Sequence, residues 1–303
     1  MILTYRKRPD FQNCFLALTI LLLNKPAFSQ PQTVNLTHLI SGGTPFDEND
    51  LAKYVASIQI KSHQKSKFGW HHFCGGTIIS SKKILTAAHC LFKNTGRLLK
   101  PYELVVVVGL RQRFTRTSHT QVMNVDVVKA HRQFRRYKTL FADVGLLILK
   151  DDIIFNEQHV AKIDLPDSEI PLTDDFCTVI GWGKIFDKGP TSDRILFTSV
   201  EILNSNDCKR KYGSSFTPGM FCAGYSDEWN RDSCSGDSGG PLICDGKIFG
   251  IVSWGIGCGR WELPGVYTNV SHYKAWISNA LCLRANCCMI VIIVFLNYFL
   301  QKK

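Results

Sequence analysis

The sequence predicts an all-β protein, a sandwich or barrel of about 240 residues. Many short segments rich in Val and Ile are separated by Gly, Pro, Asp or Asn clusters, which is typical of strands joined by turns. Helical periodicity is weak until residues 273–281, and neither a linker composition nor a repeat divides the chain. We therefore expect one folded unit or two closely packed halves.

The expected elements follow from these segments in chain order. We expect strands at Val55–Ile60, Gly76–Ile79, Leu104–Val108, Val122–Val128, Gly145–Leu149, Thr178–Trp182, Leu196–Leu203, Pro241–Cys244 and Lys247–Trp254. A helix is expected at Tyr273–Leu281, near the end.

The two ends of the chain depart from this pattern. Three basic residues at 6–8 precede an apolar run, Phe15–Leu23, and small residues lead to Ser29, as in a signal peptide cleaved after that residue. An uncut signal anchor is the alternative, but this run is far shorter than the roughly 20 residues that span a bilayer. The tail contains a second apolar stretch, Met289–Leu300, which suits a short membrane anchor, a GPI signal or an extension without a membrane role.

Charge and cysteine content limit the function classes. The net charge is +11, but residues 1–29 and 283–303 contribute +3 each, so the remainder is only modestly basic and we expect no nucleic-acid partner. Twelve cysteines indicate an oxidising compartment, in agreement with secretion. Basic residues gather in two loops, interpreted as solvated surface or as an exosite for anionic partners: Arg111, Arg113 and Arg116, then Lys129, His131, Arg132, Arg135, Arg136 and Lys138.

Three segments carry catalytic residue types. The turn GDSGGP at 236–241 places Ser238 between glycines, where backbone N–H groups can face an incoming carbonyl. His89 is a suitable general base because its pKa lies near neutrality, and Asp143 precedes an apolar strand where it can accept the imidazole N–H. The Ser238 motif also fits the nucleophile elbow of α/β-hydrolases, but the order His, Asp, Ser and the strand-rich sequence exclude that fold.

These segments and their spacing resemble the chymotrypsin–trypsin family of serine peptidases from Ile40 to about Leu281. The motifs, in family order, are TAAHC (86–90), DVGLLIL (143–149), GWG (181–183), GDSGGP (236–241) and SWG (253–255). The resemblance implies two six-stranded antiparallel β-barrels with the active site in the cleft between them and a C-terminal helix. It also implies that Ser238 is the nucleophile, His89 the base, Asp143 its orienting carboxylate, and Gly236 and Ser238 the oxyanion-hole donors.

The resemblance extends to substrate recognition. Asp232 matches the acid at the floor of the primary specificity pocket of trypsin-like members, although a turn acid is the alternative. Gly255 and Gly265 match the glycines that keep this pocket open, so peptide or protein substrates with Arg or Lys at P1 are expected. Ser253 is similar to the serine that hydrogen-bonds the triad aspartate, and Trp254 to the strand that pairs with substrate.

The cysteines also match the family. Three cysteines, Cys282, Cys287 and Cys288, have no family partner. A zinc site at His71, His72, Cys74, His89 and Cys90 would consume the catalytic base and break a bridge, so we expect no metal and no cofactor. The basic sequence at 110–113 likewise argues against calcium. The pairs implied by the resemblance are Cys74–Cys90, Cys177–Cys244, Cys208–Cys222 and Cys234–Cys258.

The expected activation site has an unusual residue before the cleaved bond. Ile40 resembles the family's new N-terminus, whose amine would pair with Asp237, but Leu39 stands where most trypsin-like zymogens have Arg or Lys. Another protease that prefers an apolar residue should therefore cut there. The expected organisation is a signal peptide (1–29), a propeptide (30–39), a peptidase domain (40–282) and the tail (283–303). Glycosylation sequons begin at Asn35 and Asn269.

The sequence thus predicts a secreted serine endopeptidase that cleaves after Arg or Lys by way of an acyl-enzyme and is made as a zymogen. Its expected partners are substrates, an activating protease and protein inhibitors. One alternative is a protease-like binding protein that stays an uncleaved zymogen because Leu39 is never cut. Another keeps the triad but changes specificity through the insertion Lys93–Tyr102.

Overall fold

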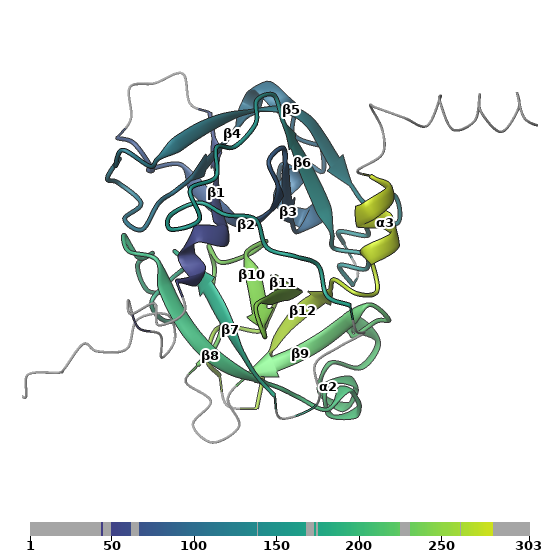
Figure 1. Cartoon of the computed structure of the whole chain (residues 1–303). Helices are drawn as coiled ribbons and strands as arrows, with labels where there is room; N and C mark the ends of the chain where they lie inside the picture. Colours follow the sequence, from purple (N-terminus) through teal and green to yellow (C-terminus); the bar gives the residue numbers. More distant parts are fainter. Residues whose placement is uncertain are drawn as a thin grey trace, which may run out of the picture. The chain divides into compact units, whose positions relative to one another are not determined.

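The computed structural model describes Thr44 and residues 50–61, 67–137, 139–167, 173, 175–224, 231–260 and 262–280. Within these residues, twelve strands form two closed antiparallel barrels of six strands each, which confirms the predicted fold class (Figure 1). The signal segment, the propeptide, the cleavage position and the tail lie outside the described residues.

The first barrel has the strand order β1-β2-β3-β6-β5-β4. Its alternating Val, Ile and Leu side chains fill the interior, and Ile58, Ile78 and Leu146 are fully buried. The strands are β1 (Val55–Ile60), β2 (His72–Ser80), β3 (Lys83–Thr86), β4 (Leu104–Val108), β5 (Gln121–Ala130) and β6 (Gly145–Leu149).

The second barrel repeats the architecture with the order β10-β11-β12-β9-β8-β7. Its interior includes the buried aromatic side chains of Phe221 and Tyr267, whose rings stack at 5.7 Å between centroids. The strands are β7 (Phe176–Gly181), β8 (Leu196–Ile202), β9 (Met220–Gly224), β10 (Pro241–Cys244), β11 (Lys247–Trp254) and β12 (Gly265–Asn269).

Three strands and one helix were not expected from the sequence. β3, β9 and β12 are only four or five residues long and contain Gly, Lys, Thr or Asn, so pairing with neighbours on both sides defines them rather than composition. The helix α2 (Ser205–Tyr212) buries only Cys208 and Tyr212, which leaves little apolar periodicity to detect. The Asn204 side chain caps it by accepting the Asn206 N–H at 2.8 Å.

The C-terminal helix α3 spans Lys274–Asn279, within the range predicted for it. This helix is yellow in Figure 1. It packs Ile277 into the core, and the Trp276 ring packs on His131 at 5.0 Å between centroids. Among the described residues, no helix combines the length and apolar character that a membrane crossing requires.

Candidate active site

The first barrel supplies a histidine and a carboxylate in direct contact. His89 lies in the 3₁₀ turn η2 (Ala88–Leu91), which follows β3, and Asp143 lies just before β6. The His89 Nδ1–H donates to Asp143 Oδ2 at 2.7 Å, and the His89 backbone N–H donates to Oδ1 at 2.8 Å. With Nδ1 protonated, Nε2 is the nitrogen that can accept a proton.

The second barrel holds this carboxylate from its other side. The Ser253 Oγ on β11 donates to Asp143 Oδ2 at 2.5 Å, and the Thr268 Oγ1 on β12 donates to the Asp143 carbonyl at 2.9 Å. Asp143 is 1 % exposed, so its charge is stabilised by donors rather than by solvent. Residues of both barrels therefore fix the Asp143–His89 pair.

The pKa of His89 is the balance of opposing effects. Burial lowers it and the Asp143 carboxylate raises it, while the Arg136 guanidinium lowers it. The net result is a pKa raised above the ordinary 6.5 of histidine. Protonated His89 is thus stabilised by the fixed negative charge beside it.

Ser238 lies on a glycine-rich turn that ends at β10. Gly236 has φ of +108° and Gly239 has φ of +79°, conformations that favour glycine, and a Cβ at Gly239 would lie 2.2 Å from Thr86 Oγ1. The turn is fixed across the barrels, because the Gly75 N–H on β2 donates to the Ser238 carbonyl at 2.8 Å.

The Cys90 Sγ lies between the serine and the histidine. It is 3.6 Å from the Ser238 carbonyl oxygen and 3.7 Å from His89 Nε2, so both residues border one small region. No hydrogen bond joins Ser238 Oγ to His89 Nε2 within the described residues, a contact that is often loose in free enzymes.

A further residue supports this turn and was not found by sequence reasoning. His72 on β2 has Nδ1 2.8 Å from Ser57 Oγ and Nε2 3.1 Å from the Gly236 carbonyl. Burial lowers the pKa of His72 to about 4, so the ring is neutral and Ser57 donates to Nδ1 while Nε2–H donates to Gly236. In the sequence His72 was noted only as a rejected zinc ligand, since nothing local relates it to a residue 164 positions away.

Asp232 is buried, with 3 % of its surface exposed, and lies against the predicted pocket residue Gly265. A Cβ on Gly265 would lie 2.6 Å from Asp232 Oδ1, and the Gly265 Cα would lie 3.9 Å from a Cβ on Gly255. Asp232 Oδ2 accepts the Gly259 N–H at 3.1 Å, whereas Oδ1 has no hydrogen-bond partner. Burial raises the pKa of Asp232 to about 7. A cation would satisfy this carboxylate.

Asp237 is a second fully buried carboxylate. Its Oδ1 accepts the Gly183 N–H at 2.7 Å and its Oδ2 the Cys234 N–H at 2.9 Å. Burial raises its pKa to about 6, and no salt bridge reaches it within the described residues. Ile40, the residue predicted to pair with it, lies outside those residues.

In the part of the chain that the structure describes, four disulfides brace the site. Because Cys74 and Cys90 are bonded to each other, the cluster that they form with His89 offers no thiolate to a metal. The bridges join Cys74 to Cys90, Cys177 to Cys244, Cys208 to Cys222 and Cys234 to Cys258, the four pairs implied by the resemblance.

Comparisons with known proteins agree with this arrangement. The trypsin family model matches residues 40–277. The similar curated proteins include serine protease 1 of Homo sapiens, 33% identical over 78% of this chain and 92% of its own length. They also include trypsin-1 of Gadus morhua (33% identical; 79% and 95%) and trypsin-3 of Salmo salar (34% identical; 80% and 98%).

The chain belongs to the trypsin family of serine proteases. As a member, this protease is a serine endopeptidase that hydrolyses protein substrates. The structure brings together the predicted His89, Asp143 and Ser253, places the Ser238 turn beside them, and groups Asp232 with Gly255 and Gly265.

Other predicted residues are less accessible or not described. Trp254 continues β11 after Ser253, and its ring packs edge-on against Tyr212 at 4.9 Å between centroids. Asn269 is 7 % exposed and its Oδ1 accepts the His272 N–H at 3.2 Å, which does not suit glycan attachment to the folded protease. Leu39, Asn35, Cys282, Cys287 and Cys288 lie outside the described residues.

Proposed function

We propose that this protease is secreted and cleaves peptide bonds after Arg or Lys, with Ser238, His89 and Asp143 as its catalytic triad. The observation that carries the proposal is the buried Asp232, whose Oδ1 lacks a hydrogen-bond partner and lies against Gly265, which in turn neighbours Gly255, at the position where trypsin-like members bind the P1 side chain. A guanidinium or ammonium group in the pocket would pair with this carboxylate, and a neutral side chain would leave it unpaired.

In the first step, the Ser238 Oγ–H proton moves to His89 Nε2 while Oγ forms a bond to the scissile carbonyl carbon. The N–H groups of Gly236 and Ser238 stabilise the resulting oxyanion. Collapse of this intermediate breaks the peptide C–N bond, and the His89 proton passes to the leaving amine. The product is an acyl-enzyme ester on Ser238.

In the second step, water gives a proton to His89 Nε2 and its oxygen attacks the ester carbonyl. The C–O bond to Ser238 then breaks, the proton returns to Oγ, and the carboxylic acid product leaves. Throughout, Asp143 keeps the His89 Nδ1–H in place and stabilises the imidazolium, the role that its 2.7 Å hydrogen bond supports.

Activation by cleavage between Leu39 and Ile40 belongs to the same proposal. The new Ile40 amine would bring a positive charge to Asp237, whose pKa of about 6 reflects burial without a cation. Asp237 directly precedes Ser238 in the turn, so its position controls the oxyanion-hole donors. Because Asp232 selects for basic residues, we propose that a different protease with an apolar preference cuts after Leu39.

The experiment replaces the residues before Ile40 with an enteropeptidase-type site and compares paired reporter peptides with P1 Arg and P1 Leu. We expect hydrolysis of the Arg reporter alone and none by the Ser238→Ala variant. Equal turnover of both reporters would contradict the Asp232 assignment. No turnover by chain verified to begin at Ile40 would contradict the catalytic proposal.

The second candidate is a binding protein retained as an uncleaved zymogen, which Leu39 favours. It predicts natural protein whose N-terminus precedes Ile40. Mass spectrometry of the N-terminus separates the two, because a chain that begins at Ile40 excludes the permanent zymogen.

A further inference from the structure

A cluster of aromatic rings and guanidinium groups, of which Trp70, Phe114 and Arg116 are exposed, lies outside the candidate active site. We call it the Arg-aromatic patch and define it as Phe68, Trp70, Arg113, Phe114 and Arg116. The Trp70 side chain is 62 % exposed and Phe114 is 39 % exposed, which is unusual for residues of this size. The Trp70 and Phe114 rings lie 6.2 Å apart between centroids.

Two loops build the patch in direct contact. Gly69 packs so closely on the other loop that a Cβ there would lie 1.9 Å from the Arg113 carbonyl oxygen. The Arg113 guanidinium carbon lies 4.5 Å from the Phe114 ring centroid, and that of Arg116 lies 4.4 Å from the Phe68 centroid. The two loops therefore bring Trp70, Phe114 and Arg116 to the surface, with the buried Arg113 packed against Phe114.

The patch is also held rigidly before any partner arrives. The Arg113 N–H donates to the Asp193 carbonyl at 2.6 Å, and its Nη2 donates to Thr191 Oγ1 at 3.0 Å. Arg113 is 6 % exposed, and its buried Nε has no hydrogen-bond partner. A preorganised surface loses little conformational entropy on binding.

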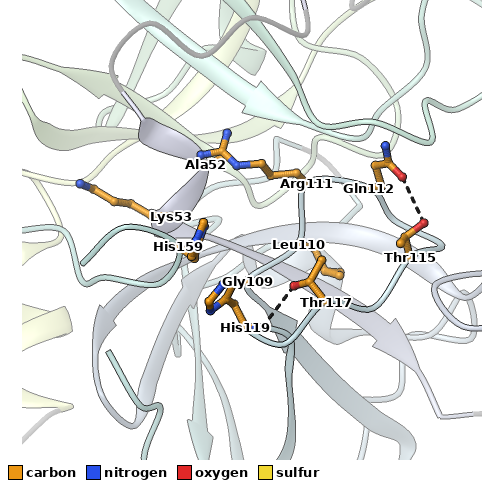
Figure 2. Close-up of a pocket in the computed structure, with 10 residues that line it drawn as sticks. All are labelled: Ala52, Lys53, Gly109, Leu110, Arg111, Gln112, Thr115, Thr117, His119 and His159. Atoms are coloured by element: carbon orange, nitrogen blue, oxygen red, sulfur yellow. Dashed lines mark hydrogen bonds between the residues drawn. The ribbon is translucent and has the colours of Figure 1, made fainter. Parts of the chain in front are cut away.

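The charge of the patch is not balanced by its own loops. Residues 61–74 and 109–119 contain no Asp or Glu, and Arg116 has no ion pair within the described residues. Arg111, by contrast, pairs with Asp50 and extends toward Ala52, at the edge of a separate cavity of about 330 Å³ (Figure 2). Within the described residues, Arg116 therefore carries the positive charge that no acid balances, whereas Asp193 lies near Arg113.

We propose that the Arg-aromatic patch binds an acidic peptide segment that carries aromatic or bulky apolar side chains, presented by a protein partner of this protease. Carboxylates of the peptide would pair with Arg116, and its apolar side chains would cover Trp70 and Phe114. A surface with both a cation and exposed rings suits such a peptide better than it suits a purely anionic polymer. The patch ends two residues before His72, whose ring binds Gly236, so a segment bound there lies beside the candidate active site. The effect of the bound segment on substrate choice rests on the proposed function, but the binding of the segment does not.

The binding test uses full-length chain with Ser238→Ala and a fluorescein-labelled nine-residue peptide of alternating Glu and Phe, followed by anisotropy. We expect a Kd of about 10–100 µM that Trp70→Ala and Arg116→Gln each weaken by roughly fivefold. Arg132→Gln and Tyr102→Ala, exposed residues on the same barrel, are the matched controls and should leave the Kd unchanged. A peptide with Gln in place of Glu should bind at least about tenfold more weakly.

An unchanged Kd in the Trp70→Ala/Arg116→Gln double variant overturns the proposal, as does no binding up to millimolar peptide. A sulfated polysaccharide that binds more tightly than the peptide and ignores Trp70→Ala also overturns it. In activated enzyme, a P1 Arg reporter with the acidic segment attached should show a higher kcat/KM than the short reporter, and the double variant should remove only that advantage. If neither reporter is cleaved, the proposed function fails while the binding result stands.

Discussion

Asp143 accepts hydrogen bonds from His89 and Ser253 through its carboxylate, so replacing it tests how the position and tautomer of His89 affect catalysis. Asp143→Asn keeps the shape but favours the tautomer of His89 that cannot act as base. We expect kcat to fall by about 10⁴, the loss established for this change in the Ser-His-Asp template.

The hydrogen-bonded pair of His89 and Asp143 also determines how kcat falls at acid pH. Because the pKa of His89 is raised above 6.5, kcat of the activated protease, measured with saturating P1 Arg substrate so that Asp232 is already paired, should fall below a midpoint higher than that value. Removing the carboxylate charge in Asp143→Asn should move this midpoint to lower pH. A profile of the two enzymes from pH 4 to 9 measures both, and a midpoint that does not move would contradict the proposed pairing.

Asp232 should make cation binding depend on pH. Its pKa of about 7 means that the carboxyl is mostly neutral at pH 6 and mostly ionised at pH 8. Benzamidine, a cation throughout this range, should therefore bind about tenfold more tightly at pH 8 than at pH 6 and release protons on binding near pH 7. Calorimetry in two buffers measures the proton release, and Asp232→Ser should abolish both binding and release.

At the scale of elements, Gly145 shows how one strand limits the catalytic turn. A Cβ on this first residue of β6 would lie 2.5 Å from Leu91 Cδ1 and 3.4 Å from the Ala88 Cα, both in the turn that carries His89. Gly145→Ala should destabilise the fold by about 1–3 kcal/mol and lower kcat, because the turn must shift. Chemical denaturation and kinetics test this. Gly246→Ala is the control: no atom lies within 4 Å of a Cβ there, but its φ is +71°, so this change should cost stability through backbone strain and leave kcat unchanged.

Elements also show how far the sequence could lead. Strands rich in Val, Ile or Leu, such as β1, β4 and β6, were predicted with their observed bounds, and the triad motifs could be recognised because their neighbours in the chain are distinctive. The strands β9 and β12 could not be found, since their order comes from pairing across the barrel. His72 and the partner-free Asp232 Oδ1 likewise depend on contacts between distant residues, which local patterns do not encode.

At the scale of the whole molecule, activation should change stability as well as activity. If the Ile40 amine reaches Asp237, cleavage supplies a cation to a carboxylate that the described residues leave without one. We expect the cut protease to melt about 5 °C higher than the uncut chain at pH 8, roughly 2 kcal/mol for a domain of this size. The Asp237→Asn variant should show no such rise, and an equal rise in both would assign the effect to another part of the chain.

The division of the site between the barrels has a consequence for how the protease fails. The histidine and its carboxylate come from one barrel, while the nucleophile, Ser253 and Asp232 come from the other. The barrels share one buried core, but the contacts that align the catalytic residues are individual hydrogen bonds such as Gly75 to Ser238. Because the strand pairs close within each barrel, a small shift of one barrel against the other would break these hydrogen bonds without opening either ring of strands. Under mild denaturation, turnover should therefore vanish while the circular dichroism of the strands persists. Loss of activity would then report that one barrel has shifted against the other, and it would not by itself show that either barrel has unfolded.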